Sequence, residues 1–179
     1  MTTRNSTQHY QGRVISVTVD DVILPNGRQA ALEVVHHPGG AAVVAINDAQ
    51  QICLLRQYRY VAGGWIWELP AGKLEPAEPP ELTARRELTE EAGVVANEWL
   101  SLGSILSSPG VFSEVIHLFL AQGLRVGRTT LEDSEVLEVH WVSLGQACDM
   151  ALSGEFRDAK TIIGVLRAAH RLGMTAASR

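Results

Sequence analysis

The feature that most constrains the fold is a charged helix whose two ends are both marked in the sequence. We expect this helix over residues 81–92, after Pro79-Pro80 and before Gly93. Proline fits the first turn of a helix, where its missing N–H costs no hydrogen bond, and glycine just past the last turn favours a left-handed C-cap. The apolar side chains form only a narrow stripe: Leu82, Leu88 and Ala92. The helix therefore packs through one edge and turns its charges outward or into a cleft.

Strand-like segments surround this helix. The runs rich in β-branched and alternating apolar residues are 13–19, 29–36, 41–46, 51–57, 100–106, 115–121 and 136–142. Two further helices are expected near the C-terminus, with Ser143 and Asp158 as their N-caps. Pro38-Gly39-Gly40 indicates a boundary. The pattern predicts an α+β sandwich over residues 41–179, preceded by a small β-segment over residues 1–40.

Composition and charge exclude several classes of function. The chain is 46% hydrophobic and 20% charged, with twenty acidic and fifteen basic side chains and a net charge of −5. This balance argues against a nucleic-acid partner, which requires clustered Lys and Arg. Neither a run of ~20 apolar residues nor a secretion signal is present, so we expect no membrane partner and a cytoplasmic location. Cys53 and Cys148 lie in apolar runs and are interpreted as buried thiols.

Three carboxylates share one face of the expected helix. Glu87, Glu90 and Glu91 are spaced i, i+3 and i+4, which places their Cβ atoms about 5–6 Å apart. One interpretation is a solvated charged face, with nearby arginines offsetting the repulsion. The other is a site for a hard cation, because Mg²⁺ binds carboxylate oxygens and leaves positions for water and substrate phosphates.

A longer pattern favours the cation site. Gly72 is followed by five residues and Glu78, then by seven residues and Arg86-Glu87-Leu88, then by Thr89, Glu90-Glu91, Ala92 and Gly93-Val94. This pattern resembles the signature of the Nudix hydrolases at every defined position. The resemblance implies an α/β/α sandwich with a mixed sheet, and metal-dependent hydrolysis of a pyrophosphate bond.

The resemblance also implies roles for single residues. Glu87, Glu90 and Glu91 correspond to the metal ligands of the family, and the backbone carbonyl of Ala71 adds another. Arg86 corresponds to the arginine that orients the Glu90 carboxylate, and Arg86 and Glu91 are the candidate catalytic residues on the helix. The implied cofactor is Mg²⁺ or Mn²⁺.

Residues outside this signature resemble the ADP-ribose pyrophosphatase branch of the family. The matching features are Trp67-Glu68-Leu69-Pro70-Ala71-Gly72, the run Arg56-Gln57-Tyr58-Arg59, Pro109 and Glu114. The branch implies hydrolysis of ADP-ribose to AMP and ribose 5-phosphate, with Arg59, Pro109 and Glu114 at the substrate. The alternative roles are a surface cation for Arg59, a turn residue for Pro109 and a solvated carboxylate for Glu114. Other functions left open are a GDP-mannose or other nucleotide-sugar pyrophosphatase and a non-catalytic ADP-ribose sensor.

Two further expectations come from the same branch. A carboxylate on a late loop activates the attacking water, and in residues 128–135 the candidate is Glu135, with Asp133 next; a solvated acidic loop is the alternative. The branch also implies a homodimer whose N-terminal strands are exchanged between the subunits. The small size of the sheet expected over residues 13–36 agrees with this, because so small a sheet is not stable alone.

Overall fold

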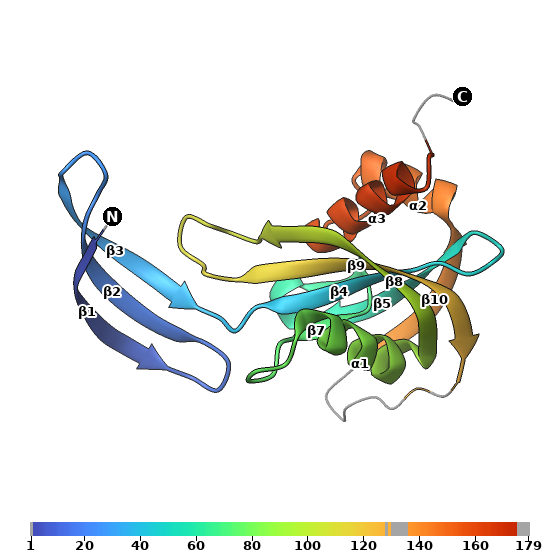
Figure 1. Ribbon diagram of the computed structural model, residues 1–179, viewed down its shortest axis with the longest axis horizontal. Coiled ribbons are helices and arrows are strands. Elements are labelled where there is room, and N and C mark those ends of the chain that lie inside the picture. Colours follow the sequence, from blue (N-terminus) through green and yellow to red (C-terminus); the bar gives the residue numbers. More distant parts are fainter. Residues whose placement is uncertain (1, 128, 130–135, 175–179) are drawn as a thin grey trace. The chain divides into compact units, whose positions relative to one another are not determined.

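The computed structural model describes residues 2–127, 129 and 136–174 (Figure 1). Its strands are β1 (Thr2–Gln11), β2 (Ser16–Ile23), β3 (Gln29–His36), β4 (Gly40–Ala45), β5 (Gln51–Arg59), β6 (Gly64–Glu68), β7 (Ala71–Lys73), β8 (Val94–Leu106), β9 (Val115–Val126) and β10 (Leu137–Ser143). Its helices are α1 (Pro80–Ala92), α2 (Leu144–Ser153) and α3 (Ala159–Arg171), with a 3-10 turn η1 (Tyr60–Ala62). Within the described ranges, none of the helices is long and apolar enough to cross a membrane.

The first of two compact units consists of Met1–Gly39 and Leu106–Val115. Its three strands form an antiparallel sheet in the order β1-β2-β3. Residues 106–115 join this unit through Val35, whose N–H donates to the Val111 carbonyl at 2.8 Å. The expected boundary at residue 40 lies next to the end of this unit's first segment. The sequence patterns placed residues 106–115 in the other part of the chain, whereas the structure groups them with this unit.

The second unit, Gly40–Ile105 and Ile116–Arg179, contains two sheets. One has the order β7-β4-β9-β8, in which β4 runs parallel to β9 and antiparallel to β7. The other has the order β10-β5-β6 and is antiparallel. The expected mixed sheet is therefore confirmed.

Strand β4 explains how the layers are held together, because it is buried along its whole length. Ala42 and Val44 belong to the core that includes α2 and α3. Ala41, Val43 and Ala45 belong to the core that includes α1. Alternate side chains of a strand point to opposite faces, so a strand covered on both faces reads as a continuous apolar run. Figure 1 shows α2 and α3 on one side of these strands and α1 on the other, which is the expected α/β/α sandwich.

The helix ends follow the sequence signals. Ser143 accepts a hydrogen bond from the Gln146 N–H at 3.2 Å, and Asp158 Oδ2 accepts one from the Thr161 N–H at 3.0 Å. Gly93 ends α1 in the left-handed conformation, with φ at 65°. Local chemistry therefore fixes where these helices begin and end.

Candidate active site

Helix α1 presents its carboxylates over the short strand β7, and the loop of residues 74–79 connects the two elements. Glu87 is 8% exposed and Glu91 is 2% exposed, whereas the side chain of Glu90 is 37% exposed. Carboxylates are rarely buried to this extent unless they are paired or bind a cation. The burial of two of the three distinguishes this helix from one with a solvated acidic face.

Strand β7 lies against the two buried carboxylates. The Ala71 N–H donates to Glu91 Oε2 at 2.8 Å. A Cβ atom added at Gly72 would overlap the Glu87 carboxylate, so glycine is required for this approach. Gly72 is paired with Ala41 in the β4–β7 ladder, which fixes the backbone beneath the carboxylate.

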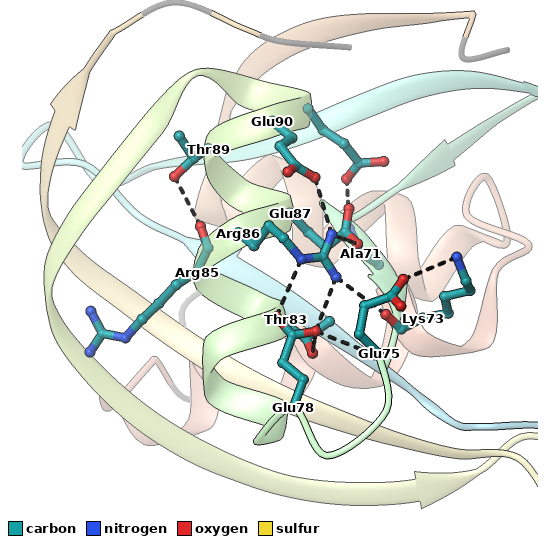
Figure 2. Close-up of polar contacts among 11 residues, drawn as sticks. Ala71, Lys73, Glu75, Glu78, Thr83, Arg85, Arg86, Glu87, Thr89 and Glu90 are labelled. Atoms are coloured by element: carbon teal, nitrogen blue, oxygen red, sulfur yellow. Dashed lines mark hydrogen bonds and ion pairs between the residues drawn. The ribbon is translucent and has the colours of Figure 1, made fainter. Parts of the chain in front are cut away.

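Arg86 connects the carboxylates of α1 with one another. Its Nη1 lies 2.7 Å from Glu87 Oε1 and 3.1 Å from Glu90 Oε2 (Figure 2). Partial burial disfavours the charged guanidinium, but the Glu78 hydrogen bonds and the Glu87 charge outweigh it and raise the pKa of Arg86. Arg86 is therefore a fixed cation at this site, within reach of the Glu90 carboxylate as the family resemblance implies.

Glu78 holds the other side of the same guanidinium. Its Oε1 accepts from Arg86 Nε at 3.3 Å and its Oε2 from Arg86 Nη2 at 3.2 Å, as Figure 2 shows. Glu78 Oε2 also accepts from the Thr83 hydroxyl at 2.7 Å and from the Glu75 N–H at 3.3 Å. The Arg86 hydrogen bonds, followed by the one from Thr83, lower the pKa of Glu78. The loop is thus joined to the helix by an arginine that also contacts the acidic cluster.

The chemistry of this site fits a hard divalent cation. Mg²⁺ and Mn²⁺ bind oxygen ligands. This site offers the carboxylate oxygens of three glutamates, beside a glycine that lets the backbone come close to them. In the side-chain positions of the described residues, however, no three acidic, His or Cys side chains converge to hold a metal ion. Instead, Arg86 forms ion pairs with Glu87 and Glu90. We therefore expect a cation to compete with Arg86 for these oxygens, and the metal-ligand roles of Ala71, Glu87, Glu90 and Glu91 stay predictions.

Arg59 lies at the end of β5 and forms a two-point ion pair. Its Nε and Nη2 donate to the two carboxylate oxygens of Glu68 at 2.9 and 2.8 Å. The Arg59 side chain is 40% exposed, whereas that of Glu68 is 4% exposed. The ion pair fixes the guanidinium and leaves part of it accessible, so phosphate binding by Arg59 stays a prediction.

Pro109 and Glu114 belong to the first compact unit. Glu114 lies with one carboxylate oxygen 3.4 Å from His37 Nδ1, and its side chain is 18% exposed. Pro109 lies in the turn between β8 and β9. The structure therefore makes Glu114 a partly buried residue of this unit, and contact of either residue with substrate stays a prediction.

The candidate general bases, Glu135 and Asp133, lie outside the described residues. Three other residues, which the sequence patterns did not single out, form buried or partly buried polar contacts next to the site: Glu68, Lys160 and Thr161. The sequence does contain an indication of a role for Glu68, because a carboxylate between Trp67 and Leu69 interrupts an apolar run just before Ala71. Lys160 and Thr161 follow a helix cap and carry no comparable signal.

Comparison with known proteins agrees with this geometry. The model of the family described as "NUDIX domain" matches residues 36–163, which is more than half of the chain. The chain therefore belongs to the Nudix family.

Two relatives and one solved structure are similar to most of this chain. The chain is 41% identical over 160 residues to the ADP-ribose pyrophosphatase of Bacillus subtilis (strain 168), covering 88% of this chain and 86% of that protein. It is 37% identical over 141 residues to the GDP-mannose pyrophosphatase of Klebsiella pneumoniae, covering 73% of this chain and 71% of that protein. A crystal structure described as an ADP compounds hydrolase superimposes with a TM-score of 0.82 at 22% identity, covering 97% of this chain and 96% of that one, which shows a shared fold.

Proposed function

We propose that this Nudix hydrolase cleaves the pyrophosphate bond of ADP-ribose to AMP and ribose 5-phosphate with a divalent cation, Mg²⁺ or Mn²⁺. The observation that carries the proposal is the paired burial of Glu87 and Glu91 against the backbone of β7, with Gly72 providing the space. The 41% identity to an ADP-ribose pyrophosphatase over most of both chains supports the choice of substrate.

The residues of the chain have separate tasks in this reaction. Glu87, Glu90 and Glu91 would hold the cation, which when bound stabilises the charge that develops on the phosphate oxygens. Arg86 orients Glu87 and Glu90 and joins the helix to the loop through Glu78. A carboxylate of the late loop, with Glu135 as first candidate, would accept a proton from the attacking water.

A panel of substrates tests the proposal directly. ADP-ribose, GDP-mannose, NADH and diadenosine polyphosphates are compared at saturating Mg²⁺, with EDTA as the control for metal dependence. ADP-ribose should give the highest kcat/KM, and EDTA should abolish hydrolysis of every substrate. A higher kcat/KM for GDP-mannose, or turnover that resists EDTA, would overturn the assignment.

The alternative substrate class is GDP-mannose or another nucleotide sugar. The specific observation in its favour is the 37% identity to a GDP-mannose pyrophosphatase over 73% of this chain. The same acidic cluster would serve both substrates, because the reacting bond is the same and only the groups on either side differ.

The unit containing β1, β2 and β3 supports the further proposal of a homodimer. Strand β1 is exposed along its whole length, and the exposed apolar residues of the unit include Tyr10 and Leu32 at 55% and 39%. A three-stranded sheet with so little covered surface gains stability from a second copy. Light scattering should give the mass of two chains, and the mass of a single chain would refute the dimer. The expected cytoplasmic location and the expected absence of nucleic-acid and membrane partners stay predictions.

A further inference from the structure

The segment that enters the candidate active site is fixed at its start by helix α3. Leu69 lies two residues before Ala71, and its N–H donates to Thr161 Oγ1 at 2.9 Å. The Thr161 hydroxyl donates in turn to Asp158 Oδ2 at 2.6 Å. Leu69 and Thr161 are fully buried, at 0% exposure each. A buried N–H that lost this acceptor would go unsatisfied, so the hydroxyl restrains the backbone at this point.

A second link between the same elements is an ion pair. Lys160 Nζ lies 2.9 Å from Glu68 Oε2 and 3.0 Å from Asp158 Oδ2, and its side chain is only 13% exposed. Burial disfavours the Lys160 ammonium, but the charges of Asp158 and Glu68 outweigh it and raise the pKa of Lys160. Glu68 is likewise kept ionised, because the Arg59 hydrogen bond and the Lys160 charge lower its pKa against the effect of burial. Both partners are therefore charged at neutral pH.

The helix backbone also packs directly on this segment. A Cβ atom added at Gly164 would lie 2.7 Å from Leu69 Cδ1 and 3.2 Å from Val44 Cγ2. Glycine at this position allows α3 to approach Leu69 closely enough for the Thr161 hydrogen bond. Asp158, Lys160, Thr161 and Gly164 together form what we call the α3 clamp.

The other end of the segment contacts the acidic cluster. The Pro70 carbonyl accepts from the Val43 N–H at 2.9 Å, and the Ala71 N–H donates to Glu91 Oε2 at 2.8 Å. Gly72 then lies beneath the Glu87 carboxylate. Leu69 lies close in sequence to the two β7 residues that make these contacts. A shift of the Leu69 backbone would therefore change where β7 meets the Glu91 and Glu87 carboxylates.

We propose that Thr161 and Lys160 are positioning residues for the hydrolase site: they hold residues 68–69 on α3 so that Ala71 and Gly72 keep Glu91 and Glu87 in place for the divalent cation. The inference rests on the proposed function in assuming a cation at this site. It adds a role for two residues that belong neither to the acidic helix nor to its loop.

Two variants test the role of the α3 clamp. Thr161→Val keeps the side-chain shape but removes the hydroxyl, and Lys160→Met removes the ammonium from Glu68. Each should weaken Mn²⁺ binding and lower kcat by about tenfold, the lower end of what the loss of an outer-shell partner produces. KM for Thr161→Val should change by less than about threefold, because Thr161 is fully buried and its hydroxyl bonds to Leu69 and Asp158. Mn²⁺ affinity is measured by calorimetry on the protein without substrate, and kcat and KM with ADP-ribose.

Two controls separate positioning from general stability. Thr161→Ser restores a hydroxyl and should return Mn²⁺ affinity to within about threefold of wild type, since the same bond to the Leu69 N–H can form. Ser143→Ala removes the N-cap hydrogen bond of α2, which lies outside the α3 clamp. This variant should lower the urea unfolding midpoint while leaving Mn²⁺ affinity unchanged.

The outcomes are distinct. Wild-type Mn²⁺ affinity in Thr161→Val and Lys160→Met, with a midpoint lowered as in Ser143→Ala, would make the clamp purely structural and overturn the inference. In a second outcome, the wild-type protein binds Mn²⁺ and both variants bind it more weakly, but the wild type hydrolyses none of the four substrates. This outcome would overturn the proposed function and support the inference. A wild-type protein that binds no Mn²⁺ would overturn both.

Discussion

Replacing Glu91 with Gln should lower kcat for ADP-ribose by about 10²- to 10³-fold, the loss expected when one electrostatic stabiliser of a transition state is removed. Glu91 is 2% exposed and accepts a hydrogen bond from the Ala71 N–H. Glutamine has the same shape and still offers one oxygen to that N–H, but it carries no charge for a cation. The fold should therefore persist, with a change in the free energy of unfolding below about 1.5 kcal/mol.

The matched control for this variant is Glu81→Gln on the same helix. The Glu81 side chain is 47% exposed and forms an i,i+4 ion pair with Arg85 at 2.8 Å. Surface pairs of this kind contribute about 0–1 kcal/mol. Arg85, the partner of Glu81, lies over the Trp99 ring at 4.6 Å from its centroid. The kcat of Glu81→Gln should stay within about twofold of wild type. If Glu91→Gln also turned over at a near-normal rate, the cation would have to be held elsewhere.

The second large effect is expected from Gly72→Ala. The new Cβ would overlap the Glu87 carboxylate, and the β-ladder with Ala41 prevents the backbone from moving away. The end of the Glu87 side chain must therefore move. Because that end is flexible, the free energy of unfolding should fall by only about 1–2 kcal/mol. A displaced ligand or catalytic group reduces kcat/KM far more, by about 10²-fold for a shift near 1 Å.

Gly145→Ala provides the comparison for the glycine substitution. Gly145 lies in the first turn of α2, and the nearest atom to a new Cβ is Met174 Cε at 4.0 Å. Alanine should be accepted there, with a gain in stability of up to about 1 kcal/mol from helix propensity. In urea unfolding the two variants should shift in opposite directions, and in ADP-ribose kinetics only Gly72→Ala should lose kcat/KM. Equal, near-normal kcat/KM in both would show that the Gly72–Glu87 contact has no part in the reaction.

Much of the fold was predictable because local chemistry determines it. Helix α1 begins and ends where Pro80 and Gly93 indicate, and the N-caps Ser143 and Asp158 form the expected hydrogen bonds. Strand β1 was not predicted, since its sequence is polar and all of its residues are exposed. Its conformation depends on antiparallel pairing with β2, which no pattern within the segment reveals.

The site was predictable to the extent that its residues are close in sequence. The spacing of Glu87, Glu90 and Glu91 places them on one helical face, and the structure adds that two of them are buried. The partners of Arg59 and Glu68 were not predictable in the same way. Glu68 pairs with both Arg59 and Lys160 and so joins β5, β6 and α3. The Glu68–Lys160 contact spans 92 positions of sequence and exists only after the layers have packed.

Diffraction from crystals grown with Mn²⁺ tests most directly whether the α1 carboxylates hold a cation, because manganese gives an anomalous signal that locates the ion. The expected result is a peak about 2.0–2.3 Å from carboxylate oxygens of at least two among Glu87, Glu90 and Glu91, with the Arg86 guanidinium displaced from the oxygens that bind the ion. A crystal saturated with Mn²⁺ that keeps both Arg86 ion pairs and shows no peak beside α1 would contradict it.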